Sequence, residues 1–192
     1  MSRTRNLMCA VGFPLVLGAC GDDPVEPGGE LTEEEAVALL RGTMSAIWGG
    51  TPIEISEDSV VLGCREGGRV TGVGKGDDEL NGDTVRLVVD IRFNPSGCKV
   101  TEGGKQFTVD GNPSFRYEFF FEYIGSTGET DITGGFSDGV KWRLGDRSGS
   151  CAMDLTLVDP EVAGETVTGS YEGKLCGHDV EVDGKGLVPP DL

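Results

Sequence analysis

The stretch Ser114-Phe-Arg-Tyr-Glu-Phe-Phe-Phe-Glu-Tyr-Ile124 decides the fold class of this sequence. Aromatic residues occupy every second position, and mostly charged residues fall between them. Successive side chains of a β-strand point to opposite faces, so this alternation predicts a strand with one buried face. The aromatic row on that face consists of Phe115, Tyr117, Phe119, Phe121 and Tyr123.

Further strand-like runs surround this stretch. Thr84–Phe93 alternates apolar and charged residues in the same way, and similar runs recur about every ten residues along the chain. Turn signals separate the runs, among them Asn81-Gly82, Gly103-Gly104 and Asp159-Pro160. This pattern predicts a mainly β domain, an antiparallel meander that forms a barrel or a sandwich.

One helix is predicted before the strands, over about residues 32–48. Thr32 and Glu35 have the spacing of a capping box, in which each side chain bonds the other residue's backbone N–H. Apolar residues then recur at helical spacing, and Gly49-Gly50 ends the pattern. A single helix of this length is marginal by itself, so we expect it to pack on the sheet.

The first twenty residues have the features of an export signal. Arg3 and Arg5 precede a short apolar run, which is too short to span about 30 Å of hydrocarbon as a helix. The run ends in Leu17-Gly18-Ala19-Cys20, which resembles the lipobox of bacterial lipoproteins. The resemblance implies that residues 1–19 are removed and that Cys20 receives fatty acyl chains such as palmitate, which anchor the protein to a membrane.

A polar Pro/Gly tether, Gly21–Glu30, follows the lipobox and could reach up to about 30 Å from a membrane. Gly21, rather than Asp, follows the cysteine, and by analogy with lipoprotein sorting in enteric bacteria this favours the outer membrane of the cell envelope. We therefore predict a signal peptide (1–19), a lipidated cysteine with its tether (20–30), one mainly β domain (31–182) and a loose C-terminal tail (183–192).

Four cysteines remain after Cys20, namely Cys64, Cys98, Cys151 and Cys176. An even number in an oxidising compartment predicts two disulfides, for which three connectivities exist. We favour Cys64–Cys98 and Cys151–Cys176, because strands that are neighbours in the chain most often pair. A zinc site of four thiolates is the alternative, although the chain lacks the C-x₂-C pair typical of such sites.

The mature chain is strongly acidic. All 33 acidic residues lie after Cys20, whereas 14 of the 16 basic residues remain after cleavage, which gives a net charge of −19. Such a surface repels nucleic acid, so we expect no nucleic-acid partner.

A weak calcium motif lies in Asp77–Asp83. Asp77, Glu79 and Asn81 hold oxygen ligands at positions one, three and five of a calcium loop, and Gly82 stands at position six. Val88 occupies position twelve, where such a loop needs a bidentate acid. Asn81-Gly82 is also a strong hairpin signal, so calcium stays a second hypothesis and no other cofactor is predicted.

No catalytic constellation is recognised. Gly135-Phe-Ser137-Asp-Gly139 matches the G-x-S-x-G pattern, but that motif needs a helix after the serine. Val140–Leu144 alternates instead as a strand, so we predict a hairpin turn at Asp138-Gly139 and no serine nucleophile. His178, the only histidine, is expected in a surface loop.

These observations predict a non-enzymatic envelope module that binds a small apolar ligand or another envelope protein. A cavity behind the aromatic row would favour a ligand, whereas an exposed apolar patch would favour a protein partner. Two alternatives stay open. One is a structural module assisted by calcium, and the other is a hydrolase with two carboxylates that face each other in a cleft.

Overall fold

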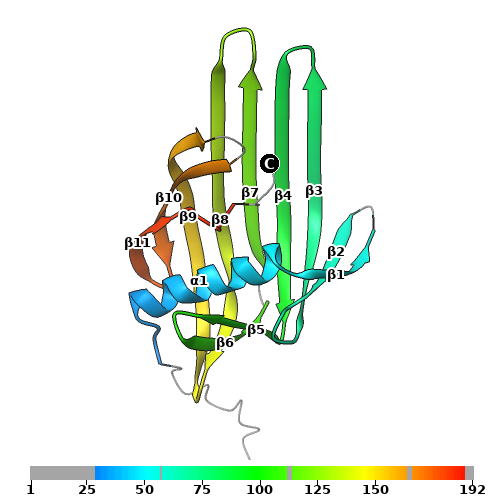
Figure 1. Cartoon of the computed structure of the whole chain (residues 1–192). Coiled ribbons are helices and arrows are strands. Elements are labelled where there is room, and N and C mark those ends of the chain that lie inside the picture. The colour runs from blue at the N-terminus through cyan, green and yellow to red at the C-terminus, as the bar shows by residue number, and fades with distance from the viewer. Residues whose placement is uncertain (1–28, 57, 112–113, 164–165, 189–192) are drawn as a thin grey trace, which may run out of the picture.

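The computed structural model describes residues 29–188, except 57, 112–113 and 164–165 (Figure 1). The predicted signal peptide, Cys20 and nearly all of the tether lie outside the described residues. Within the described part, no helix has both the length and the apolar character needed to cross a membrane.

One helix and eleven strands make up this part of the chain. They are α1 (Glu33–Trp48), β1 (Thr51–Ile55), β2 (Ser59–Gly63), β3 (Arg69–Asn81), β4 (Thr84–Ser96), β5 (Cys98–Glu102), β6 (Lys105–Asp110), β7 (Phe115–Ile124), β8 (Glu129–Leu144), β9 (Arg147–Ala163), β10 (Thr166–Leu175) and β11 (His178–Asp183).

All strands belong to one antiparallel sheet, in the order β1-β2-β3-β4-β7-β8-β9-β10-β11, with the β5–β6 hairpin attached through β6 to β8. The predicted mainly β fold with one packed helix is therefore confirmed. The sheet has free edges at β1 and β11 among the described residues, so it does not close into a barrel.

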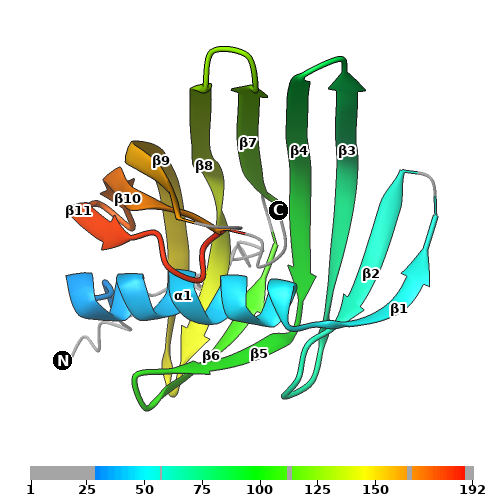
Figure 2. The same ribbon diagram turned by 45° about the horizontal axis from the view of Figure 1, so that its top comes forward.

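The sheet curves around α1, which lies across one of its faces (Figures 1 and 2). We call this side the helix face and the opposite side the outer face. The Trp48 ring packs edge-on against the sheet, with its centroid 6.0 Å from that of Phe93 and 5.7 Å from that of Tyr117. Burial of these large side chains between helix and sheet supplies the main stabilisation of the fold.

The helix begins as its sequence predicts. The Glu35 backbone N–H donates to Thr32 Oγ1 at 3.3 Å, and the Thr32 N–H donates to Glu35 Oε2 at 3.0 Å. The apolar residues that recur at helical spacing form a stripe along α1, and three of them, Leu40, Met44 and Ile47, are almost completely buried. The stripe therefore docks on the protein's own sheet.

Both predicted disulfides, Cys64–Cys98 and Cys151–Cys176, are present. The first attaches the start of β5 to the turn between β2 and β3, and the second links β9 to the residue after β10. Because all four sulfur atoms are bonded in pairs, the alternative of a four-thiolate zinc site is wrong. Two disulfides are typical of proteins that fold outside the reducing cytoplasm.

Two dipeptides that the sequence predicts as turns lie within strands instead. β8 continues through Asp138-Gly139, and β9 continues through Asp159-Pro160. Asp138 (φ 71°) and Asp159 (φ 47°) adopt left-handed backbone conformations that kink the strands without ending them. At Asp138 the kink has a clear reason, since there β8 leaves its partner β7 and begins to pair with β6.

The prediction of a loose tail over residues 183–192 is wrong for residues 183–188, since Asp183 is the last residue of β11. Leu187 and Val188 are buried, and the Trp48 indole N–H donates to the Leu187 carbonyl at 3.3 Å. Arg41 donates to the Asp183 carbonyl at 3.1 Å. Two apolar residues without a periodic pattern gave no signal of this packing.

Two long hairpins extend past the helix at one end of the sheet (Figures 1 and 2). They are β3–β4 and β7–β8, and β4 pairs with β7 over the full length of β7. We call residues 76–89 and 119–134 the four-stranded extension.

Candidate functional site

The helix face of the extension carries an exposed apolar surface. Leu80, Val85 and Tyr123 are direct cross-strand neighbours on β3, β4 and β7, and they are 79%, 40% and 39% exposed. The next row toward the helix contains the neighbours Leu87 and Phe121, which are half-buried. Neighbouring side chains in such rows lie about 5 Å apart, so these five form one continuous patch, which we call the apolar patch.

The predicted aromatic row runs from the core to this patch. Phe115, Tyr117 and Phe119 are at most 2% exposed, whereas Phe121 is half-buried and Tyr123 exposed. The Tyr117 ring centroid lies 5.1 Å from that of Phe136 and 6.4 Å from that of Phe119. The buried end of the row is therefore packed core, and its open end contributes to a surface.

Two tyrosine hydroxyls lie inside this core. Neither Tyr117 Oη nor Tyr171 Oη has a hydrogen-bond partner of good geometry among the described residues. Burial raises the pKa of Tyr117 far above its ordinary value and raises the pKa of Tyr171 to about 12. Both phenols are therefore neutral at physiological pH.

The extension is acidic, and most of its carboxylates lie on the outer face, whereas Asp78 shares the face of the apolar patch. Arg86 is its only cation, and its guanidinium lies 5.4 Å from the Phe120 ring centroid on the outer face. The seven carboxylates in the extension are Asp77, Asp78, Glu79, Asp83, Glu122, Glu129 and Asp131, which gives it a net charge of −6. The extension that bears the uncovered apolar surface is thus strongly negative as a whole.

The three residues of the predicted calcium loop are not brought together. Asp77, Glu79 and Asn81 alternate along β3 on the outer face, so neighbours among them lie about 7 Å apart. Among the described residues, no group of three or more His, Cys, Asp or Glu side chains is arranged to hold a metal ion.

A shallow basin of about 460 Å³ lies over β4, β7, β8 and β9, and its polar lining belongs to the outer face. Asp90 and Glu118 are cross-strand neighbours there, and Arg116 bridges them with contacts of 2.7 and 2.9 Å. Hydrogen bonds from Arg116 hold the pKa of Asp90 below its ordinary value. A carboxyl acting as a general acid needs the opposite shift, so Asp90 is not suited to that role.

Ser137 and His178 lie apart in the structure. Ser137 lines the basin from within β8, and a strand rather than a helix follows it. The His178 imidazole Nε2 lies 2.7 Å from the Leu31 carbonyl, beside the start of α1. His178 begins β11, so the expected surface loop is a strand instead.

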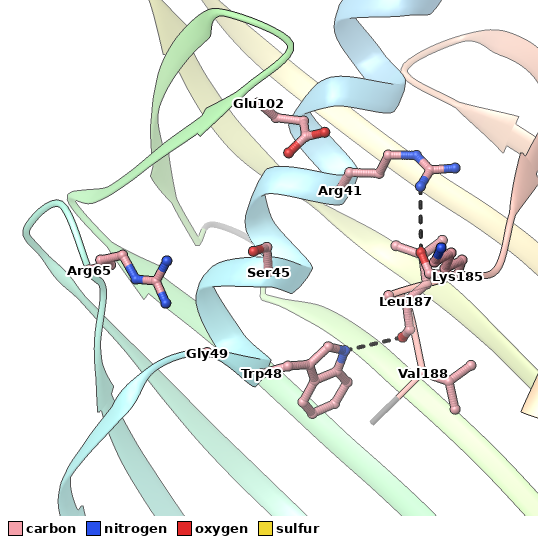
Figure 3. Close-up of a pocket in the computed structure, with 10 residues that line it drawn as sticks. Arg41, Ser45, Trp48, Gly49, Arg65, Glu102, Lys185, Leu187 and Val188 are labelled. Atoms are coloured by element: carbon pink, nitrogen blue, oxygen red, sulfur yellow. Dashed lines mark hydrogen bonds between the residues drawn. The ribbon is translucent and has the colours of Figure 1, made fainter. Parts of the chain in front are cut away.

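A second cavity, of about 430 Å³, lies at the C-terminal end of α1 (Figure 3). We call it the helix-end pocket. Four segments far apart in the sequence form its walls, namely the last turns of α1, the β2–β3 connection, the end of β5, and residues 185–188. Its side chains include Arg41, Arg65, Lys185, Glu102 and Trp48. Sequence reasoning missed this pocket, because no local pattern joins these segments.

No protein-family model, no curated protein and no solved structure matches the chain.

Proposed function

We propose that this protein is a lipid-anchored, non-enzymatic binding module of the bacterial cell envelope, and that its four-stranded extension docks a cationic, amphipathic segment of a partner protein. Cys20 would carry the anchor, and the ten-residue tether would let the domain reach partners up to about 30 Å from the membrane.

The observation that carries the proposal is the apolar patch. Leu80, Val85 and Tyr123 are adjacent, exposed and on one face of two paired hairpins. Water contact with such a surface is unfavourable by roughly 25 cal/mol for each Å² that a partner could cover. Contiguous exposed apolar patches of this kind mark interaction sites in soluble domains.

The charge of the extension supports a cationic occupant. Free fatty acids and many phospholipids carry a negative charge, which the net charge of −6 on the extension would repel, with Asp78 on the same face as the patch beside Leu87. A segment with leucine-like residues on one face and Lys or Arg at its edges would bury the patch and approach the carboxylates. Electrostatic attraction would also accelerate its association at low salt.

The dense packing of the buried part of the aromatic row also favours a protein segment over a small ligand. The buried residues of the row, Phe115, Tyr117 and Phe119, pack against other aromatic rings. Only the far end of the row, at Tyr123, is exposed. A flat patch at the end of a sheet fits an extended or helical segment better than it fits a buried small molecule.

The test measures binding of two synthetic amphipathic helices that share their leucines and differ in having lysine or glutamate on the polar face. We expect the mature protein to bind the lysine peptide, with an affinity that falls as salt rises. Leu80→Ser and Tyr123→Ser should each weaken binding by about fivefold or more, because each removes an apolar contact.

The matched control is Ile55→Ser on β1, since Ile55 is also apolar and 73% exposed but lies outside the extension. Equal binding of both peptides, or equal loss in the control and the Leu80 variant, would overturn the assignment of this patch. Preference for the glutamate peptide would overturn the charge argument.

A further inference from the structure

We propose that the helix-end pocket binds an oxyanion group, a phosphate or a carboxylate, through Arg41, Arg65 and Lys185. The pocket is a second site, separate from the apolar patch, and the proposal does not depend on the partner proposed for the extension. Its volume of about 430 Å³ is within the range of small-molecule sites.

The first argument is a local reversal of charge. Acidic residues outnumber basic ones by 33 to 16 in the whole chain. Among the side chains that line the pocket, by contrast, three are cations and one, Glu102, is an acid. A concave site with an excess of one sign of charge favours ligands of the opposite sign, and here the excess is positive on a strongly acidic protein.

The second argument is that these three cations are available. Five other basic side chains form ion pairs with carboxylates: Arg92, Lys105, Arg116, Arg147 and Lys174. Neither Arg41, Arg65 nor Lys185 has an ion-pair partner among the residues that the structure describes. Arg65 is partly balanced by Glu66, whose pKa it helps to lower, whereas no carboxylate pairs with Arg41 or Lys185 among the described residues, and an external anion would satisfy their charge.

The third argument is that Arg41 is held in place. Its guanidinium donates to the backbone carbonyls of Asp183 at 3.1 Å and Lys185 at 3.4 Å. These neutral acceptors fix the orientation without cancelling the charge, and a guanidinium with five N–H donors has others left for a ligand. Figure 3 shows Arg41 and Lys185 together on one side of the helix, with Arg65 across the end of the helix from them.

Trp48 completes one wall. Its indole N–H donates to the Leu187 carbonyl at 3.3 Å, which ties residues 185–188 to the end of α1. Leu187 and Val188 line the pocket beside it. An apolar portion attached to the anionic group would therefore have a surface on which to lie.

A purely structural role explains only part of this arrangement. Arg65 Nη2 lies 3.8 Å from the position that a Cβ on Gly49 would occupy, at the end of α1. The last turn of α1 holds no basic residue, so Arg65 there offsets the negative end of the helix dipole. That role of Arg65 does not explain why Arg41 and Lys185 also line this cavity.

The experiment follows the Trp48 indole N–H signal by nuclear magnetic resonance, using the isotope-labelled mature chain in a neutral, phosphate-free detergent. The chain has two tryptophans, and Trp142 is buried in another part of the core, so the two signals report different sites. Inorganic phosphate is the first probe. We expect a saturable shift of the Trp48 signal with a Kd of about 1 mM or below.

Four variants separate a specific site from a general charge effect. Arg65→Gln and Lys185→Gln should each weaken phosphate binding by about three- to tenfold, because each removes a charged donor. Glu102→Gln should tighten binding, since it removes the one repelling carboxylate. Arg92→Gln makes the same charge change on the outer face, where Arg92 pairs with Asp138, and should have no effect.

A second probe, short-chain phosphatidylglycerol, distinguishes the source of the oxyanion. If the lipid binds at least tenfold more tightly than phosphate, the site is assigned to a lipid headgroup. If the two affinities are similar, the site is assigned to a free anion. The proposal is overturned if the Trp48 signal responds to phosphate no more than to chloride at equal ionic strength, or if Arg92→Gln weakens binding as much as Arg65→Gln.

Discussion

The Glu35 carboxylate accepts hydrogen bonds from Arg147 at 2.6 and 3.2 Å while it also closes the capping box with Thr32 at 3.0 Å. Arg147 begins β9, 112 residues later in the chain. One side chain thus completes the helix N-terminus and attaches the helix to the sheet. Its position is fixed from both sides, which makes Glu35 a sensitive point for stability.

We expect Glu35→Gln to lower the free energy of unfolding by about 1–3 kcal/mol at pH 7, because it removes charge-assisted bonds at a mostly buried carboxylate. The hydrogen bonds from Arg147 hold the pKa of Glu35 below its ordinary value. Stability from this carboxylate is therefore present above the unfolded-state pKa and lost as the pH falls through the folded-state pKa.

Urea unfolding at pH 7 and at pH 3 measures this effect. The gap between wild type and Glu35→Gln should narrow at the lower pH, where the wild-type carboxylate becomes protonated. Glu33→Gln is the control, because Glu33 is exposed in the same first turn of α1. A loss of equal size in both variants would show that the helix dipole, and not the bond to Arg147, dominates.

The strands that sequence could predict are those with one buried face. β7 alternates because Phe115, Tyr117 and Phe119 face the core while the residues between them face outward. β1 was missed, since every one of its residues is exposed and it shows no alternation. The outer part of β3 was missed because Gly76–Asn81 holds residues that are rare in strands, and its pairing with β4 overrides that preference.

The candidate sites were predictable only in part. The apolar patch contains Phe121 and Tyr123 from the predicted aromatic row, but the sequence alone did not indicate which end of the row is uncovered. That depends on where α1 ends, because Trp48 covers Tyr117 and not the residues farther along β7. The helix-end pocket joins Arg41, Arg65 and Lys185 across the chain, and only the folded topology brings them together.

The disulfides lead to a second prediction. Cys64–Cys98 closes a sequence separation of 34 residues, so the variant Cys64→Ser/Cys98→Ser should be less stable by about 3–4 kcal/mol on the chain-entropy model. Hydrogen exchange should show the main loss of protection in β5 and β6, which this bond attaches to the β2–β3 turn.

Intact-mass analysis of the oxidised mature protein, with alkylation, should find no free thiol among Cys64, Cys98, Cys151 and Cys176. Four alkylated cysteines would contradict both bonds.

The anchor at Cys20 leads to a third prediction. Cys20→Ala should release the protein from membranes into the soluble fraction, because the cysteine thiol is the attachment point of the acyl chains. Fractionation of cells followed by immunoblotting measures this. Cys9→Ala is the matched control, since Cys9 is within the predicted signal and would be removed with it. A processed Cys20→Ala chain that stays in the membrane fraction would refute the lipid anchor.

The buried tyrosine pair leads to the last prediction. The two phenols lie close enough to affect each other's pKa, but neither Tyr117 Oη nor Tyr171 Oη has a hydrogen-bond partner of good geometry among the described residues, so replacing either by phenylalanine removes a poorly satisfied polar group. We expect Tyr117→Phe and Tyr171→Phe to leave the free energy of unfolding unchanged or to raise it by about 1 kcal/mol at pH 8.

The same pair should limit stability in alkali. Burial raises the pKa of Tyr171 to about 12, so the folded state retains a proton that the unfolded state releases above about pH 10. Stability from this phenol is complete below the unfolded-state pKa and is lost as the pH rises toward 12. Unfolding measured between pH 8 and pH 11 should therefore show a steeper decline for wild type than for Tyr171→Phe. A variant that is destabilised by more than about 1 kcal/mol at pH 8 would instead show that the hydroxyl has a partner in the folded protein.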